Sequence, residues 1–399
     1  MSTVCLSMIV KNETHIIHEC LNSIWQHIDY WIIVDTGSTD GTQDLIRNFF
    51  AEKGIPGELI EQPWVNFGHN RTEAITLCNG KADYAWMIDA DDRILGDFKY
   101  PNSKNLEHDA YALKCGRESC IWWRNQIFKT GIGWHYVGIL HEYANCPKQP
   151  LNQAKIDGNY HLEARTLGAR NVNVTQVEKY TKDAEMLLKA LETEPTNSRY
   201  QFYLAQSYFD SQQWEKAIEA YYKRVEMGGW EEECYYSLFR VALCEIAKQS
   251  DWHIIQQKLL DSYDYRPCRA EPLHAISRYL RMNGRPRAGY MFAKHAASIP
   301  YPQHDILFID TAVYSWMIMD EVAATAFYVH EYNVGKSACE SLLKSGALPP
   351  SEVTRVQTNH KAYSDKVLEI QTAQQLAQPK QMVVPTLLNT NNKFKKRRK

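Results

Sequence analysis

Over the first 100 residues, short apolar runs alternate with longer stretches in which apolar residues recur at helical spacing. The runs with the length and the β-branched and aromatic content of strands are residues 4–10, 30–34, 58–61 and 84–88. The spacing between these runs predicts helices at residues 15–25, 42–53 and 70–78. Because the predicted strands are almost wholly apolar and alternate with helices, the pattern indicates an α/β fold, a mostly parallel sheet with helices on both faces.

From about residue 176 the apolar spacing follows the helical period throughout. Small and aromatic residues in the segment 198–230 fall at the offsets of a 34-residue tetratricopeptide unit; they are Ala205, Tyr208, Ala217 and Tyr221. The segment 269–302 shows matching offsets, 316–349 is a weaker copy, and 231–267 fits only a degenerate, elongated unit. Small residues at these offsets let antiparallel helices approach closely, so we expect an all-α solenoid of stacked helix pairs.

These patterns divide the chain into three expected parts. They are an α/β domain over residues 1–175, tetratricopeptide-like helical repeats over 176–371, and a disordered basic tail over 372–399. The tail is rich in Gln, Asn and Pro and ends in the basic run 393–399. Two interpretations of it stay open: a solubilising tail, and a nuclear-type address or contact with a polyanion.

Composition narrows the classes of function. The 399 residues include 45 Lys and Arg against 47 Asp and Glu, and a net charge of −2 excludes capture of nucleic acid or anionic lipid by the chain as a whole. No specific binding of nucleic acid is therefore expected. The ten cysteines include no C-x-x-C pair, which disfavours zinc ribbons and disulfide scaffolds and indicates reduced thiols in a cytoplasmic setting.

The apolar N-terminus is interpreted as a buried strand. It has no basic region before the apolar run, and a polar segment follows after ten residues, which is not the pattern of a signal peptide. No stretch approaches the roughly 18–20 uninterrupted apolar residues that a transmembrane helix needs. We therefore expect a soluble or peripheral protein with no transmembrane segment.

Three carboxylates, Asp89, Asp91 and Asp92, follow the apolar run at 84–88 directly. Like charges this close raise one another's pKa values, so such a cluster indicates a bound cation. Mg²⁺ or Mn²⁺ is typically held by one or two carboxylates together with phosphate oxygens of a substrate. The alternative is a solvated turn in which an Asp caps a helix, and an isolated D-x-D would favour that alternative.

A second polar cluster, residues 34–42, joins the end of a predicted strand to a glycine turn and the start of a helix. Exposed amides at such a turn can contact a nucleotide, and an Asp there can accept from a base N–H or a ribose hydroxyl. The same residues are also ordinary turn formers. In a parallel sheet the carboxyl ends of the strands share one edge, so we expect this cluster to lie near the acidic triplet and residues 11–13.

Four motifs in one order, residues 7–13, 34–42, 66–71 and the acidic triplet, resemble the inverting glycosyltransferases of family 2. The resemblance implies a Rossmann-like GT-A domain with a D-x-D metal motif, well matched over residues 3–100 and loosely over 101–175. The chain also resembles family members that carry a tetratricopeptide extension, and this resemblance covers nearly its whole length. The implied activity is that of a metal-dependent hexosyltransferase, which moves a sugar from a nucleotide-sugar, expected to be a UDP-sugar, to a hydroxyl acceptor.

The resemblance also implies roles for particular residues. The implied ligands of Mn²⁺ or Mg²⁺ are Asp89, Asp91, Asp92 and the late histidine His161. The implied nucleotide-sugar site consists of Lys11, Glu13, Asp35, Asp40, Arg71, Asp89, Arg165 and Arg170. Many family members carry two consecutive Asp where this sequence has Asp35 and Thr36. Because of this departure, recognition of the nucleotide base is expected from Asp35, Asp40 or backbone groups.

The acceptor side is expected in the segment 120–161, which is rich in aromatic residues that can stack on sugar rings. Inverting transfer needs a carboxylate that takes the proton of the acceptor hydroxyl. Glu142, beside His141 at the end of an apolar run, is the candidate base. Its alternative is a surface glutamate next to a structural histidine.

Other functions compete with this interpretation. In one, the repeats bind a peptide and the α/β domain is a degenerate nucleotide-binding module, although a module without activity does not need mutually repelling carboxylates. In another, the chain is a nucleotidyltransferase, for which a glycine-rich loop would be expected after the first strand. Residues 8–13 contain no glycine. Under the favoured interpretation the repeats hold a glycan or protein acceptor, or recruit a partner.

Overall fold

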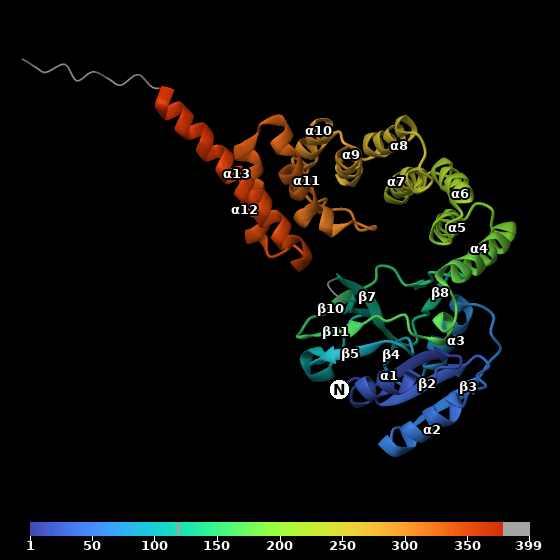
Figure 1. The fold of residues 1–399 in the computed structure, drawn as a ribbon. Coiled ribbons are helices and arrows are strands. Elements are labelled where there is room, and N and C mark those ends of the chain that lie inside the picture. Colours follow the sequence, from blue (N-terminus) through green and yellow to red (C-terminus); the bar gives the residue numbers. More distant parts are fainter. Residues whose placement is uncertain (118–119, 378–399) are drawn as a thin grey trace, which may run out of the picture. The chain divides into compact units, whose positions relative to one another are not determined.

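The computed structural model describes residues 1–117 and 120–377. The chain divides into two compact units, Met1–Ser250 and Asp251–Lys399, and each buries a hydrophobic core of its own (Figure 1). The division does not coincide with the change in sequence pattern at residue 176. The first helices after that point belong to the same unit as the α/β domain.

Within the described part of the first unit, nine strands form one sheet. The four strands that the sequence predicts are β1 (Val4–Val10), β2 (Tyr30–Asp35), β3 (Gly57–Glu61) and β4 (Tyr84–Met87). They pair in parallel in the order β3-β2-β1-β4. Between them lie α1 (Ile17–Ile24), α2 (Thr42–Lys53) and α3 (Phe67–Leu77), where the sequence predicts helices. The expected α/β fold is therefore confirmed.

The remaining strands extend the sheet from β4 and make it mixed. β7 (Cys120–Lys129) runs antiparallel to β4 and to β6 (Ala110–Arg117). Strands β10 (Gln153–Ile156) and β11 (Tyr160–Glu163) both pair in parallel with β6. Strand β5 (Arg93–Gly96) pairs antiparallel with β11 and is the edge strand on this side. A separate two-stranded sheet consists of β8 (His135–Val137) and β9 (Tyr143–Asn145).

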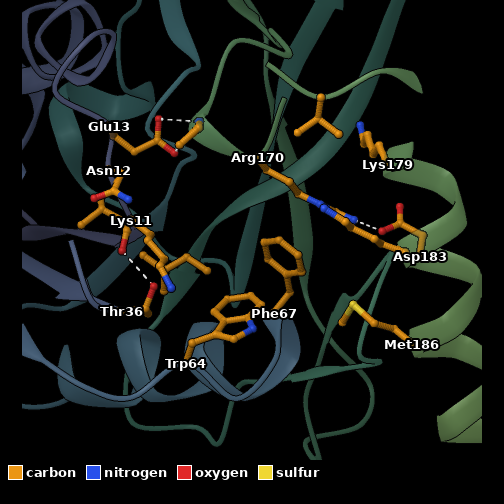
Figure 2. Close-up of a pocket in the computed structure, with 15 residues that line it drawn as sticks. Lys11, Asn12, Glu13, Thr36, Trp64, Phe67, Arg170, Lys179, Asp183 and Met186 are labelled. Atoms are coloured by element: carbon orange, nitrogen blue, oxygen red, sulfur yellow. Dashed lines mark hydrogen bonds and ion pairs between the residues drawn. The ribbon is translucent and has the colours of Figure 1, made fainter. Parts of the chain in front are cut away.

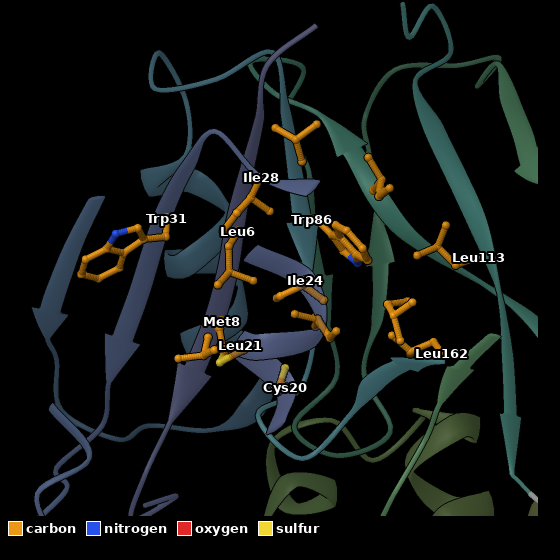
Figure 3. Packing of buried hydrophobic residues seen from close by; sticks show 14 of the residues in the cluster. Leu6, Met8, Cys20, Leu21, Ile24, Ile28, Trp31, Trp86, Leu113 and Leu162 are labelled. Carbon is orange, nitrogen blue, oxygen red and sulfur yellow. The ribbon is translucent and has the colours of Figure 1, made fainter. Parts of the chain in front are cut away.

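Helices cover both faces of the parallel strands because successive side chains of a strand point to opposite faces. On one face, Leu6 and Met8 of β1 pack with Cys20 and Leu21 of α1 (Figure 3). Cys5 points the other way and packs with buried residues of α3. Burial of a Leu or Met side chain stabilises the fold by about 1.5–3 kcal/mol relative to exposure. This core fixes the strand ends, which carry the polar clusters.

Helices α4 (Gln176–Thr193), α5 (Ser198–Asp210), α6 (Trp214–Glu226) and α7 (Glu231–Ala247) complete the first unit, each packed against the next. A capping box between Thr175 and Glu178 starts α4. Ala205 of α5 and Ala217 of α6 are fully buried, as the repeat offsets predict. The expected helix pair at 198–230 is therefore present.

The second unit is helical throughout its described part. Its helices are α8 (Trp252–Tyr265), α9 (Glu271–Met282), α10 (Pro286–Ala296), α11 (Ile318–Thr325), α12 (Tyr332–Ser345) and α13 (Pro350–Ala377). The pairs α9 with α10 and α11 with α12 match the predicted repeats at 269–302 and 316–349. Helix α13 continues through residue 377, into the predicted tail, and residues 378–399 lie outside the described part. None of the described helices combines the length and apolar character that a bilayer crossing requires.

Candidate functional site

The polar segments that follow β1 and β2 are joined by side-chain hydrogen bonds at one edge of the sheet. The backbone N–H of Asn12 donates to Ser38 Oγ at 2.8 Å, and the N–H of Thr39 donates to Asn12 Oδ1 at 2.8 Å. The N–H of Glu13 donates to Thr42 Oγ1, also at 2.8 Å. The expected meeting of residues 11–13 with residues 35–42 is therefore present.

Asp35 ends β2 with its side chain almost fully buried. Its Oδ1 accepts from the N–H of Gly37 at 2.9 Å and of Ser38 at 2.8 Å, so the carboxylate shapes the turn that follows. Gly37 has φ +104°, a conformation that side chains of L-residues rarely adopt. Asp35 Oδ2 is buried without a hydrogen-bond partner among the described residues. A buried oxygen in this state is suited to accept a hydrogen bond from a ligand.

Asp40 joins the start of α2, whose N-cap is Gly41, to the segment after β1. Its carboxylate accepts from Thr42 Oγ1 at 2.6 Å and from Thr14 Oγ1 at 2.7 Å, and also from both backbone N–H groups of these residues. Burial raises the pKa of Asp40, but these hydrogen bonds outweigh it and lower the pKa to about 2. Both oxygens of Asp40 therefore have structural partners.

Glu13 and Asp91 converge on one loop, residues 164–175, which connects β11 to α4. Asp91 Oδ2 accepts from the N–H of Leu167 at 2.8 Å and of Gly168 at 2.9 Å. Glu13 accepts from the N–H of Ala169 at 3.2 Å. A Cβ at Gly168 would lie 3.2 Å from Glu13 Oε1 and 3.5 Å from Asp91 Oδ2, so a larger residue would crowd both carboxylates.

Arg71, on the second turn of α3, bridges Asp89 and Glu142. Its Nη2 donates to Asp89 Oδ1, and its Nε lies 2.7 Å from Glu142 Oε1. Burial disfavours the charge of the guanidinium, but the two carboxylates outweigh this and raise the pKa of Arg71. Burial likewise opposes the charge of Asp89, and the attraction of Arg71 and Arg124 lowers its pKa overall. Three residues predicted separately thus form one charged cluster.

Asp92 and Arg165 make contacts within the protein, and Asp92 shares Arg124 with Asp89. The side chain of Asp92 is 4% exposed; Oδ2 lies 3.3 Å from Arg124 Nη2, and Oδ1 accepts from the N–H of Arg165 at 3.1 Å. Burial, with the nearby charge of Asp89, raises the pKa of Asp92 to about 8. Arg165 donates to the carbonyl oxygen of Asp91 at 2.5 Å and to Glu19 at 2.6 Å.

The predicted metal ligands are only partly brought together. Among the described residues, no group of three or more His, Cys, Asp or Glu side chains is arranged to hold a metal ion. His161 lies on β11 opposite Leu95. Among the described residues, no hydrogen bond or ion pair joins it to the acidic triplet. Two carboxylates do converge, those of Asp91 and Glu13. The arrangement therefore fits a divalent cation that takes these two carboxylates and draws its other oxygen ligands from a substrate.

A cavity of about 490 Å³ opens beside these residues (Figure 2). The sheet edge contributes Lys11, Asn12, Glu13 and Thr36, the start of α3 contributes Phe67 with nearby Trp64, and the opposite wall carries Arg170, Lys179, Lys182, Asp183 and Met186. That volume lies in the usual range of small-molecule sites. The sequence pointed to Lys11, Glu13 and Arg170 but missed the α4 side chains. A helix 90 residues beyond the acidic triplet carries no local signal that it lines the same cavity.

Comparison with known proteins finds similarity over parts of the chain. Residues 5–151 match the model of the glycosyl transferase family 2. The lipopolysaccharide core biosynthesis glycosyltransferase LpsC of Rhizobium meliloti is 30% identical over 130 residues, which cover 33% of this chain and 44% of that protein. A TPR repeat-containing protein of Synechococcus elongatus is 32% identical over 96 residues, covering 24% and 22%. The chain spans less than half the length of either relative.

Solved structures give weaker similarities. The crystal structure of S. aureus TarS in complex with UDP-GlcNAc aligns with a TM-score of 0.34 and 14% sequence identity, covering 65% of this chain and 89% of that one. Similarity to the glycosyl transferase family 2 therefore rests on the match over residues 5–151.

Proposed function

We propose that the protein, whose residues 5–151 match the model of the glycosyl transferase family 2, transfers a sugar from a nucleotide-sugar to a hydroxyl group of an acceptor. One observation carries the proposal. The carboxylates of Glu13 and Asp91, the Asp89–Arg71–Glu142 cluster and the cavity lie at the carboxyl edge of the parallel strands. Ligands of open α/β sheets bind at that edge.

The cavity is the proposed donor site, and the expected donor is a UDP-sugar. Asp35 does not line the cavity but directly precedes Thr36, which does; we assign its unpartnered Oδ2 to a base N–H or a ribose hydroxyl. The aromatic side chains of Trp64 and Phe67, whose ring centroids are 4.8 Å apart, offer apolar surface to the nucleoside. Lys11 and Arg170 add positive charge to the same cavity.

A divalent cation, Mn²⁺ or Mg²⁺, would be held by Asp91 and Glu13. When bound, it would neutralise the negative charge of the departing diphosphate. The residues of the chain orient the donor. The amides of Leu167, Gly168 and Ala169 fix both carboxylates, and Asp89 is held in place by Arg71.

Glu142 is the proposed general base. As the acceptor oxygen attacks the anomeric carbon, a carboxylate takes the hydroxyl proton, and the bond from that carbon to the diphosphate breaks on the opposite face, so the configuration inverts. The side chain of Glu142 is 13% exposed, and Arg71 fixes its direction. Arg71 also contacts Asp89, so one guanidinium orients groups on the acceptor side and on the donor side.

The helical repeats are proposed to position the acceptor, a hydroxyl of a glycan or protein. Helices α4 and α5 belong to the same unit as the catalytic domain, and α4 side chains line the donor cavity. An acceptor bound along these helices would lie close to the carboxyl edge of the sheet. Its chemical identity is the part of the proposal that a donor assay leaves for later experiments.

A nucleotide-release assay tests this function without knowledge of the acceptor. The full chain is incubated with UDP-, GDP- and dTDP-sugars in Mn²⁺, Mg²⁺ or EDTA, beside Asp91→Asn and the control Asp97→Asn. Asp97 is exposed and paired with Lys99, so its variant keeps the site intact. We expect metal-dependent release from one donor that only Asp91→Asn loses. If no donor is hydrolysed or bound, the transferase proposal is wrong, and a scaffold with a degenerate nucleotide-binding domain is the better account.

A further inference from the structure

One wall of the donor cavity comes from outside the matched domain. Helix α4 begins at Gln176, 25 residues after the family match ends at residue 151. It nevertheless places Lys179, Lys182, Asp183 and Met186 against the cavity that the sheet edge lines from the other side (Figure 2). The catalytic domain alone would leave this wall open.

The charges on this wall are not balanced. Arg170 donates to Asp183, and the Asp183 side chain is 4% exposed, so this ion pair occupies the one carboxylate that α4 brings to the cavity. Lys179 lies half-buried beside the pair, and its ammonium has no ion pair with any carboxylate of the described residues. Burial and the neighbouring Arg170 lower its pKa, and the nearby carboxylates only partly offset this.

The other cations of the cavity are differently placed. Lys11 and Lys182 are exposed, so water screens their charges, and Arg170 is already paired. Arg165, which the sequence analysis includes in the nucleotide-sugar site, is bound to Glu19 and to the carbonyl oxygen of Asp91 and does not line the cavity. Among the described residues that line the cavity, Lys179 is the half-buried cation without a carboxylate partner; its ammonium lies 5.2 Å from the ring centroid of Tyr180.

We propose that Lys179 binds the phosphate groups of the nucleoside diphosphate part of the donor. This inference rests on the proposed function and deepens it. Half-buried ammonium groups bind phosphate oxygens by charge-assisted hydrogen bonds, which are about twice as strong as neutral ones. Lys179 and Glu13, one of the carboxylates proposed to hold the cation, line the same cavity.

The arrangement of the cavity supports phosphate over a neutral group. The lining combines the aromatic pair Trp64 and Phe67, which suits a nucleoside, with the cations Lys179 and Arg170. The Arg170 guanidinium lies over the Phe67 ring, 5.1 Å from its centroid, so aromatic surface and positive charge adjoin in one cavity. A molecule that combines an aromatic group with a doubly charged diphosphate matches this lining. The first helix of the repeat region is thereby part of the donor site and has a role beyond support of the acceptor.

The test compares binding of UDP and of uridine to the full chain by calorimetry, in the presence of Mn²⁺. The variants are Lys179→Gln, Lys179→Arg and the control Lys189→Gln. Lys189 is exposed, lies on the same helix about 15 Å away along its axis, and does not line the cavity. Both glutamine variants remove one positive charge from α4. Circular dichroism confirms that each variant is folded.

We expect Lys179→Gln to weaken binding of UDP by about ten- to a hundredfold and to leave binding of uridine unchanged. Lys179→Arg should recover most of the affinity for UDP, and Lys189→Gln should behave as the unchanged protein. The proposal is wrong if Lys179→Gln binds UDP as tightly as the control, or loses affinity for uridine to the same extent. In those cases the transferase proposal stands. If the unchanged protein binds none of UDP, GDP and dTDP, both proposals fail together.

Discussion

The imidazole ring of His141 stacks on the ring of Tyr203, with centroids 3.9 Å apart and planes inclined by 10°. Tyr203 lies on α5, whereas His141 precedes the proposed base, Glu142, in the loop between β8 and β9. Arg199, also on α5, donates to the carbonyl oxygen of His141 at 2.7 Å. His141 has φ +51°, and these contacts from α5 hold it in that uncommon conformation. The first helix pair thus positions the segment that carries Glu142.

Loss of this contact should slow the chemical step. We expect Arg199→Ala to lower kcat by about tenfold, because Glu142 loses its fixed position, with little change in KM for the donor. Steady-state kinetics of nucleotide release or transfer measures both constants. Lys223→Ala, on the exposed face of α6, is the control and should change neither. A rise in the KM of Arg199→Ala for the donor at unchanged kcat would contradict a role in positioning Glu142.

Removal of Arg71 should destabilise the fold as well as abolish activity. The side chain of Arg71 is 12% exposed, and Arg71→Met leaves Glu142 without its cation and Asp89 with only Arg124, at 3.9 Å. We expect a loss of about 3 kcal/mol in the free energy of unfolding, measured by urea titration. Arg47→Met breaks only exposed pairs and should cost under about 1 kcal/mol. Equal losses in the two variants would contradict the account of a partly buried charge cluster.

Asp40 should make stability depend on acid pH. Its pKa in the folded protein is about 2, below its ordinary value of 3.8, so the stabilisation is complete above about pH 4 and is lost as pH falls toward 2. We expect the unchanged protein to lose up to about 1 kcal/mol more than Asp40→Asn over that interval, a small figure because Asp40 is exposed. Urea titrations near pH 5 and pH 2.5 measure the difference. The same loss in both proteins would show that the carboxylate of Asp40 does not contribute.

Substitutions of Asp91 and Asp92 should affect activity to different extents. We expect Asp91→Asn to lower donor turnover by about a hundredfold or more, because Asp91 is a proposed ligand of the cation. Asp92→Asn should stay within about tenfold of the unchanged rate, because the Asp92 side chain is buried against Arg124 and Arg165 and its raised pKa favours the neutral acid that Asn mimics. Turnover of Asp92→Asn as low as that of Asp91→Asn would place both carboxylates in the active site.

Much of the fold could be predicted because its signals are local. β1 and α2 have the predicted bounds, since β1 is an unbroken apolar run and α2 is flanked by the glycines Gly41 and Gly54, both with positive φ. The helix pairs could be predicted from small residues at the repeat offsets, such as Ala205 and Ala217, which the structure buries. Such patterns are set by neighbours along the chain and can be read without a structure.

The rest of the site depends on contacts between distant residues. The hydrogen-bond donors to Asp91 and Glu13 are backbone N–H groups of residues 167–169. Because nearly every residue has a backbone N–H, the sequence does not show which of them bind these carboxylates. Arg71 and Glu142 each stood out, but their pairing is made only when the loop between β8 and β9 meets α3. Lys179 looked like any exposed helical lysine. These contacts are products of packing between elements.

The central claim is that the cavity beside Glu13 and Asp91 is the donor site of a glycosyltransferase. A crystal structure of the full chain with UDP and Mn²⁺ tests it most directly. The account predicts that the nucleotide occupies the cavity, with the cation at Asp91 and Glu13 and the phosphates within hydrogen-bond distance of Lys179 Nζ. A nucleotide bound elsewhere, or a cavity that stays empty at saturating UDP, would contradict the account.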